Sequence, residues 1–354
     1  MPVPERDESP RQRLAARRRR LFGRILVLAV LLMVSPALTI ALGPAGVPIP
    51  EVLGVIASHI PGLDVDITWS QTADAIVWQT RAPRIVGAVV VGAVLGTSGV
   101  VLQAIVRNPL AEPYVLGVSS GASTGAAVGM VIIGTTSAVG VSGLAFIGAL
   151  IATGLVLLIG GRQGSSLHLV LGGLAVGFGF QAVTNLIVFS SGSPETSRAV
   201  MFWMLGSLGR ISWSDLPVVS VVAVVLVALM MLFGPVLDAL SSGDNTARSV
   251  GVEPGPARAI LLVLVSAAVG VAVATAGSIG FVGLVIPHMM RSFVGHSHRM
   301  LVLASALASS LFLVWADAFA RIAFAPAELP LGVVTGLVGA PILVVLVRRL
   351  APGR

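Results

Sequence analysis

The chain contains neither cysteine nor lysine, and all 22 of its basic residues are arginine. Without cysteine it has no disulfide, no thiolate nucleophile and no cysteine metal ligand. Without lysine it has no Walker A site, because that phosphate-binding loop needs its lysine, and it has no Schiff-base lysine. These two absences exclude several classes of enzyme before any motif is considered.

Charge is also scarce. Charged residues make up 10% of the 354 residues, hydrophobic residues make up 56%, and the mean hydropathy is +0.99. Soluble domains are about 25% charged, so this chain cannot cover a surface that faces water. Its apolar runs of about twenty residues predict membrane-spanning helices, not the short alternating strands of a β-barrel. The net charge of +7 does not indicate a nucleic-acid partner, because the arginines gather at one end of the chain and on one membrane face.

The sequence predicts an all-α polytopic membrane protein with one membrane domain, residues 21–350. It predicts about ten spans, at residues 22–42, 85–106, 115–134, 143–160, 168–190, 216–234, 259–276, 279–294, 301–322 and 331–349. Pro287 interrupts the eighth of these spans. Residues 43–84 are predicted to form a compact but irregular loop. Residues 235–258 are predicted to form a second long loop, with a short helix on either side of Gly251.

The distribution of arginine predicts the orientation. Residues 1–20 form an arginine-rich extension, and with the N-terminus inside, 17 of the 22 arginines lie on the inner side. The acidic residues divide almost evenly, with 7 inside and 8 outside. The positive-inside rule therefore favours two cytoplasmic termini. A cleaved signal peptide is the alternative, but the apolar stretch Ile25–Leu42 is longer than the usual core of 7–15 residues.

No catalytic residue and no metal site are predicted. His288, His296 and His298 have no cysteine or carboxylate beside them in the sequence, and histidine ligands need such partners at fixed geometry. Apart from His288, the middles of the predicted spans contain no ionisable residue, which a proton- or sodium-coupled carrier would normally show. Neither a membrane enzyme nor a stand-alone secondary carrier is favoured, and an energy source on another polypeptide is the simpler interpretation.

The segment "RNPLAEPYVLGVSSGAS", residues 107–123, follows the second predicted span on the cytoplasmic side. Its two prolines disfavour helix at the preceding residues and make it stiff. Gly117, Gly121 and Gly125 then recur at a spacing that lets membrane helices approach closely. Two interpretations remain open: a turn followed by a tight helix contact, or a stiff cytoplasmic loop that narrows a pathway or contacts a partner.

Three arginines on the predicted outer side form a second candidate site. Arg81 and Arg84 lie in "TRAPR", and Arg321 ends "ADAFAR". Asp317 and Arg321 are four residues apart on one helix and are expected to pair. Arginines at the mouth of a span can simply extend toward the interface. Alternatively, they form a patch for an acidic partner, because guanidinium groups bind carboxylates bidentately.

Three long blocks resemble a known family. They are "TRAPRIVGAVVVGAVLGTSGVVLQAIVRNPLAEPYVLGVSSGAS", "GSIGFVGLVIPHMMRSFVGHSHR" and "ADAFARIAFAPAELPLGVVTGLVGAPILVVLVRR". They are similar to the signature blocks of FecCD-type ABC importer permeases for iron-siderophore, haem and cobalamin. The resemblance covers residues 20–350. It implies a ten-helix permease in the bacterial cytoplasmic membrane that works as a homodimer, or as a heterodimer, without a cofactor of its own.

The resemblance also implies partners and cargo. Two ATPase subunits, which hold ATP and Mg, are expected on the cytoplasmic side, and an extracytoplasmic substrate-binding protein is expected outside. The cargo is expected to be an iron chelate, with ferric siderophore first and haem or cobalamin next.

Site residues follow from the same resemblance, position by position. Arg81, Arg84 and Arg321 are expected to meet acidic residues of the binding protein. An inner gate is expected at Asn108, Leu110, Ser165 and Ser166. Contacts with the ATPase are expected at Ala247, Arg248, Ser249, Val250, Gly251 and Val252.

Overall fold

The computed structural model describes residues 10–135, 137–160 and 166–350. These residues are mostly helical, and none of them forms a β-strand. The α-helices are α1 (Pro10–Ala41), α2 (Ile49–Ser58), α3 (Gln71–Asp74), α4 (Ala82–Val106), α5 (Val118–Ala127), α6 (Ala138–Gly160), α7 (Ser166–Ser190), α8 (Pro194–Met204), α9 (Leu216–Leu232), α10 (Gly234–Ser241), α11 (Asp244–Ser249), α12 (Pro254–Ala276), α13 (Val282–Val294), α14 (His298–Ile322) and α15 (Leu331–Leu350). Short π-helical or 3-10 segments are η1 (Ala75–Arg81), η2 (Pro113–Leu116) and η3 (Val128–Ile133).

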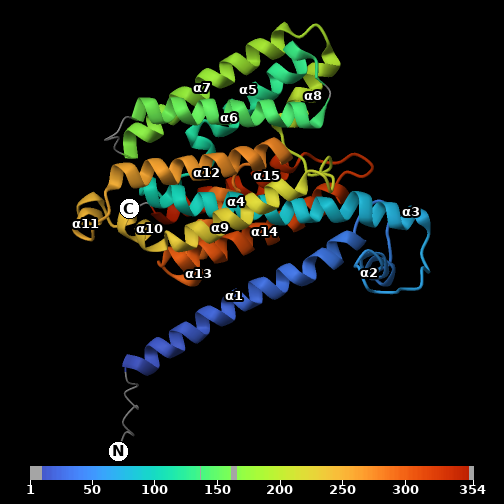
Figure 1. The fold of residues 1–354 in the computed structure, drawn as a ribbon, viewed down its shortest axis with the longest axis horizontal. Helices are drawn as coiled ribbons and strands as arrows, with labels where there is room; N and C mark the ends of the chain where they lie inside the picture. The colour runs from blue at the N-terminus through green and yellow to red at the C-terminus, as the bar shows by residue number, and fades with distance from the viewer. Residues whose placement is uncertain (1–9, 136, 161–165, 351–354) are drawn as a thin grey trace, which may run out of the picture.

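Helix α4 lies inside the larger of two helical groups (Figure 1). α14 packs along α4, and α9, α12 and α13 also contact it. In the second group α5 packs against both α6 and α7, and α12 joins the groups by contacting α6 as well as α4. α1 lies at the side of the bundle against α14. Only 11% of the residues in its most apolar stretch are buried within the chain.

The two ends of the bundle differ in what they carry. α2, α3 and α8 lie at one end, whereas α10 and α11 lie at the other, toward which the start of α1 also points (Figure 1). The helix that contains the first predicted span begins at Pro10, so part of the arginine-rich extension is continuous with that span. Residues 1–9 of the extension lie outside the described residues.

Each of the ten predicted spans falls on an apolar helix, but the helices differ in length. Among the described residues, seven helices are long and apolar enough to cross a membrane, or eight if the bent pair α9 and α10 counts as one span. The third and eighth predicted spans correspond to shorter apolar helices, Val118–Ile133 and Val282–Val294. The multi-span all-helical fold is confirmed, and the count of about ten stays a prediction.

The long loops are more ordered than the sequence indicated. The prediction of an irregular loop over residues 43–84 is wrong: α2 occupies part of it, and continuous helix begins at Gln71, well before the predicted span. The Ser70 side chain caps that helix by accepting a hydrogen bond from the N–H of Ala73 at 3.1 Å. The helices predicted on either side of Gly251 are present as α11 and the start of α12.

Glycines bring α5 and α6 into backbone contact. A Cβ atom added at Gly121 or Gly125 would collide with the carbonyl of Gly148 or Leu144 on α6. Gly117 has a φ of 73°, and this left-handed conformation lets the chain turn from η2 into α5. The interpretation of the glycine spacing as a tight helix contact is therefore confirmed.

This contact predicts the effect of a single methyl group. Gly125→Ala should destabilise the protein by about 1–3 kcal/mol, because α5 and α6 must separate to admit the Cβ atom. Gly179→Ala on α7 is the matched control: a Cβ atom there meets nothing within 4 Å, and alanine favours helix by up to about 1 kcal/mol. Thermal unfolding of both variants in detergent checks this. Equal transition temperatures for the two variants would show that the contact is looser than the structure indicates.

Candidate functional site

The three arginines predicted on the outer side come together at one end of the bundle. Arg84 lies at the start of α4, and its Nε donates a hydrogen bond to Asp317 Oδ1 of α14 at 2.6 Å. Its Nη1 lies 2.8 Å from Glu328 Oε2 in the segment between α14 and α15. Arg321 Nε lies 3.2 Å from Asp317 Oδ2, so the predicted pairing of these two residues is confirmed. The buried carboxylate of Asp317 therefore pairs with both Arg84 and Arg321.

Arg81 and Arg321 also bind the end of α1. Arg81 donates to the carbonyls of Ile40 and Ala45, both at 2.6 Å. Arg321 donates to the carbonyls of Thr39 and Leu42 at 2.9 and 3.0 Å. The last carbonyls of a helix have no partner within the helix, so these guanidinium groups supply donors to two of those carbonyls, Thr39 and Ile40, and to two carbonyls just beyond the helix.

Burial limits what these arginines can offer a partner. Arg81, Arg84 and Arg321 are only 5%, 4% and 3% exposed, respectively. They hold α1, α4 and α14 together and do not form an exposed cationic patch. A contact with a binding protein would require their internal partners to be released, and their docking role stays a prediction. Sequence reasoning did not identify Glu328 or the carbonyls of α1, since each lies far along the chain from the arginine that it contacts.

Local hydrogen bonds order residues 107–117, which we call the gate segment because part of the inner gate is expected there. α4 ends at Val106, and the next residue, Arg107, has a left-handed φ of 55°. The Asn108 side chain accepts a hydrogen bond from the N–H of Leu110 at 2.9 Å, and Ala111 N–H donates to the Asn108 carbonyl at 3.1 Å. Leu110 is half-buried. These two hydrogen bonds define a turn after α4, and the stiffness and the gating role of this segment stay predictions.

The gate segment is bonded to a break between α12 and α13. Tyr114 Oη accepts a hydrogen bond from the N–H of Ile279 at 2.8 Å, and Glu112 Oε1 accepts one from the N–H of Phe281 at 2.5 Å. Ser119 Oγ lies 2.5 Å from Ser278 Oγ. Sequence reasoning missed this junction, although the glycines at both ends of "GSIG" gave a signal for irregular backbone.

The expected gate partners between α6 and α7 are only partly covered by the structure. Ser165 lies outside the described residues. Ser166 begins α7, and its side chain lies outside the described part as well. The expected proximity of these serines to Asn108 and Leu110 therefore stays a prediction.

The expected ATPase-contact residues form the tip of the bundle end that carries α11 (Figure 1). Ala247 is fully buried and anchors α11, and Val252 is half-buried, its N–H donating to the Ala247 carbonyl at 2.9 Å. Arg248, Ser249, Val250 and Gly251 are exposed. Val250 is 64% exposed, so an apolar side chain stands at the tip.

Asp244, the first residue of α11, joins this tip to the gate segment. Its carboxylate accepts hydrogen bonds from Arg258 of α12, one of them at 3.2 Å, and lies 3.5 Å from Nη1 of Arg107. Arg258 is only 4% exposed. The hydrogen bonds from Arg258 are the main cause of a lowered pKa of Asp244, and the charge of Arg107 adds to it. The sequence gave no direct signal for this contact.

The fold places one carboxylate beside one of the three histidines. His298 begins α14, and its Nδ1 lies 2.6 Å from Asp238 Oδ1 of α10, which also accepts the backbone N–H of His298 at 3.0 Å. The expectation that no carboxylate accompanies the histidines is therefore wrong for His298, which lies beside Asp238. In the described residues no three histidine or acidic side chains form a group that could hold a metal ion.

Comparisons with known proteins agree on one family. The model of the FecCD transport family matches residues 28–349. The chain is 40% identical over 280 residues to the cobalamin import system permease protein BtuC of Halobacterium salinarum, covering 78% of this chain and 74% of that protein. It is 39% identical over 287 residues to the vitamin B12 import system permease protein BtuC of Vibrio cholerae, covering 79% and 85%.

Solved structures show the same architecture. A metal-chelate type ABC transporter in an inward-facing conformation superimposes with a TM-score of 0.80 at 30% identity, over 92% of this chain and 98% of that one. A more distant structure, PsaBC from Streptococcus pneumoniae in complex with Fab, has a TM-score of 0.52 at 17% identity and shares the fold alone.

The arginine cluster predicts unequal effects for its two carboxylates. Asp317→Asn should cost about 3–5 kcal/mol of stability, because it leaves two buried guanidinium groups without their shared carboxylate. Glu328→Gln should cost about 1 kcal/mol or less, since its side chain is 45% exposed and water can replace it. Thermal unfolding of the detergent-solubilised variants checks this. Similar losses of stability for the two variants would mean that Asp317 is not the main partner of the buried arginines.

Asp244 predicts a pH dependence. Because its folded-state pKa lies below the ordinary value of about 4, its stabilising contribution is complete above that ordinary value and is lost as the pH falls through the lowered one. The stability difference between the wild-type protein and Asp244→Asn should therefore be constant near neutral pH and narrow below about pH 4.

Unfolding measured across pH checks this, with Glu253→Gln as the control. Glu253 is exposed on the same segment, so its variant should follow the wild type at every pH. If the difference in stability between the wild type and Asp244→Asn widens as the pH falls, the pairing of Asp244 with Arg258 and Arg107 is contradicted.

Proposed function

The chain belongs to the FecCD transport family of ABC importer permeases, and we propose that it carries a metal chelate into the cytoplasm as the membrane-spanning subunit of a binding-protein-dependent importer. The observation that carries this proposal is the link through Asp244. It connects the exposed tip of α11 to Arg107 at the start of the gate segment. A permease driven by a separate ATPase needs such a connection between its partner-facing tip and its pathway.

The proposed assembly contains two copies of this chain, two ATPase subunits and one extracytoplasmic binding protein. α11 and the residues up to Val252 would lie on the ATPase, and the end that carries α2, α3 and α8 would face the binding protein. This placement puts the arginine-rich start of α1 in the cytoplasm, in line with the positive-inside rule. ATP and Mg would be held by the ATPase, and the proposed location is the bacterial cytoplasmic membrane.

The proposed mechanism is conformational. When the two ATPases close on ATP, each pushes on the Val250 tip of one permease. The Asp244 carboxylate transmits this displacement to Arg258 and thus to α12, and to Arg107 and thus to the gate segment. Two packings of the helices alternate, and the partners determine which of them is more populated. The permease forms no covalent bond with its cargo.

The cargo is proposed to be a cobalamin, a ferric siderophore or haem. The names of the BtuC relatives favour cobalamin, whereas the expectation from the sequence put ferric siderophore first. Both are large metal chelates, and the name of the similar solved transporter refers to the same chemical class.

Uptake into sealed vesicles tests the proposal. The vesicles would contain this permease, its co-encoded ATPase and the binding protein, with radiolabelled cobalamin, ferric siderophore or haem offered outside. We expect entry of one chelate only when ATP is present inside. Entry without ATP would contradict the proposal and support the stand-alone carrier.

A variant of the tip serves as an internal check. Val250→Asp should abolish ATP-dependent entry, because a buried carboxylate at the proposed ATPase contact would lack a partner. Val250→Ile keeps an apolar side chain and should retain transport. Full transport by Val250→Asp would place the ATPase contact elsewhere on the chain.

A further inference from the structure

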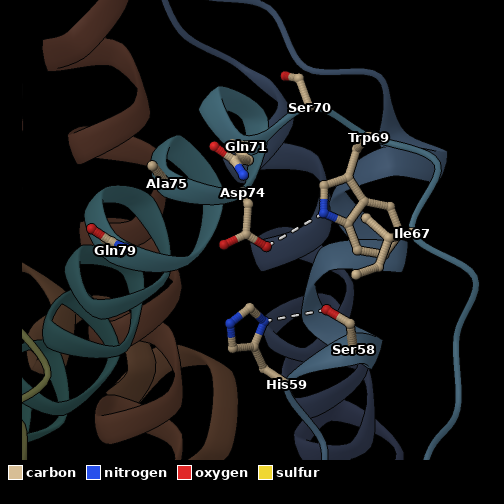
Figure 2. A pocket seen from close by; sticks show the side chains of 9 residues that line it. All are labelled: Ser58, His59, Ile67, Trp69, Ser70, Gln71, Asp74, Ala75 and Gln79. Carbon is tan, nitrogen blue, oxygen red and sulfur yellow. Dashed lines mark hydrogen bonds between the residues drawn. The ribbon is translucent and has the colours of Figure 1, made fainter.

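Two features of the described residues have no part in the proposed function: a pocket beside α2 and the start of α1. The pocket has a volume of about 480 Å³ (Figure 2). Two of its polar side chains already bind groups of the protein: Trp69 Nε1 donates to Asp74 Oδ1 at 3.3 Å, and His59 Nδ1 lies 2.9 Å from the carbonyl of Val55. The arginines at the start of α1 differ from these groups, because no carboxylate of the described residues pairs with them.

The start of α1 carries an uncompensated positive charge. The 32 residues of α1 include arginines at positions 11, 13, 17–20 and 24, and they include no acidic residue. The part of α1 that is apolar enough to span a membrane begins at Arg19. Arg19, Arg20 and Arg24 are exposed. The charge at the mouth of this span is therefore available to an anion from outside the described part of the chain.

The outward face of α1 joins an arginine to a row of apolar side chains. At 3.6 residues a turn, five exposed residues fall within an arc of about 80°: Arg19, Phe22, Leu26, Val30 and Met33. We call them the α1 stripe. Leu28 and Ser35 are buried on the opposite side of the helix, where Trp315 Nε1 of α14 donates to Ser35 Oγ at 3.0 Å. The α1 stripe therefore points away from the bundle.

The length of α1 places Arg19 and Arg20 at the level of lipid headgroups. From Leu21 to Ala41 the helix rises about 30 Å, at about 1.5 Å per residue, which matches the thickness of the hydrocarbon core. The two arginines come directly before this stretch. The α1 stripe thus has apolar side chains at the depth of acyl chains and a guanidinium group at the depth of phosphates, which guanidinium groups bind through two donors.

Arg24 holds the start of the span against the body. Its Nη1 donates to the carbonyl of Phe293 near the end of α13, and its guanidinium group lies 5.1 Å from the centroid of the Phe293 ring. Arg19 and Arg20 therefore extend from a helix that is already positioned. A ligand that binds them does not have to order this part of the chain first, which lowers the entropic cost of binding.

We propose that Arg19 and Arg20 bind the headgroups of anionic phospholipids in the leaflet at the start of α1. Each arginine near a negatively charged membrane surface favours binding by about fivefold. A second copy of this chain fits the α1 stripe less well, because a twofold axis along the membrane normal would bring Arg19 of both copies to the same depth on facing helices. A soluble partner fits less well too, since the stripe continues into the depth of the span. The inference needs only that the chain lies in a membrane, and so it does not depend on the proposed function.

Quenching by brominated lipids tests the inference on the full-length chain in nanodiscs. Because the chain contains no cysteine, Phe22→Cys gives a single site for a fluorescent label, on an exposed position of the α1 stripe. Brominated phosphatidylglycerol, which is anionic, should bind beside the label about fivefold or more tightly than brominated phosphatidylcholine, which has no net charge. Arg19→Gln together with Arg20→Gln should remove most of this preference. Arg19→Lys together with Arg20→Lys keeps the charge and should retain most of it.

Arg198→Gln together with Arg210→Gln is the matched control. Both residues are exposed, and they lie on α8 or just after it, at the other end of the bundle (Figure 1). Their loss removes the same charge and should change the lipid preference at the label by about twofold or less. Thermal unfolding would verify that all variants are folded.

Three results would overturn the inference. The first is equal binding of the two lipids beside the label in the protein that keeps all its arginines. The second is a preference that survives the loss of both Arg19 and Arg20. The third is weak quenching by both lipids, which would show that protein covers the α1 stripe and would favour a protein contact instead.

Discussion

The chain must satisfy its backbone hydrogen bonds where water is absent, and this constraint explains the most unusual part of the fold. An unpaired N–H or C=O in hydrocarbon costs several kcal/mol, so irregular backbone is tolerated there only when protein groups supply partners. At the break between α12 and α13 the N–H groups of Ile279 and Phe281 find Tyr114 and Glu112. The break therefore depends on the gate segment, and a displacement of one relative to the other would break these bonds.

The buried arginines likewise supply hydrogen-bond partners to backbone groups, here at the end of α1. α1 ends in carbonyls that have no helical partner, and Arg81 and Arg321 supply the donors. Their charge, with that of Arg84, would be costly so deep in the bundle without Asp317, which is itself almost fully buried. Charged residues at these span ends thus serve backbone hydrogen bonding and helix assembly, which explains why they are present in a chain with so little charge.

The sequence predicted features that depend on neighbours along the chain, and missed those that depend on the fold. Long apolar runs marked the spans, the four-residue spacing paired Asp317 with Arg321, and repeated glycines marked the α5 contact. α8 was missed although Ser193 and Pro194 form a local start signal, because the helix is short and not apolar throughout. The outer arginines were taken as exposed, since a sequence shows that a residue ends a span but not which distant carbonyls lie beside it.

A continuous set of contacts runs from the tip of α11 to the break at α13. Ala247 fixes α11 to the body, Asp244 at its first turn holds Arg107, and Arg107 lies directly before the segment that bonds to the break. A flexible loop in the middle of this path would absorb a displacement of the tip. The segment after Arg107 cannot do so, because two prolines and the Asn108 turn restrict its backbone. The restricted backbone that marked this segment in the sequence therefore lies directly between the tip of α11 and the break at α13.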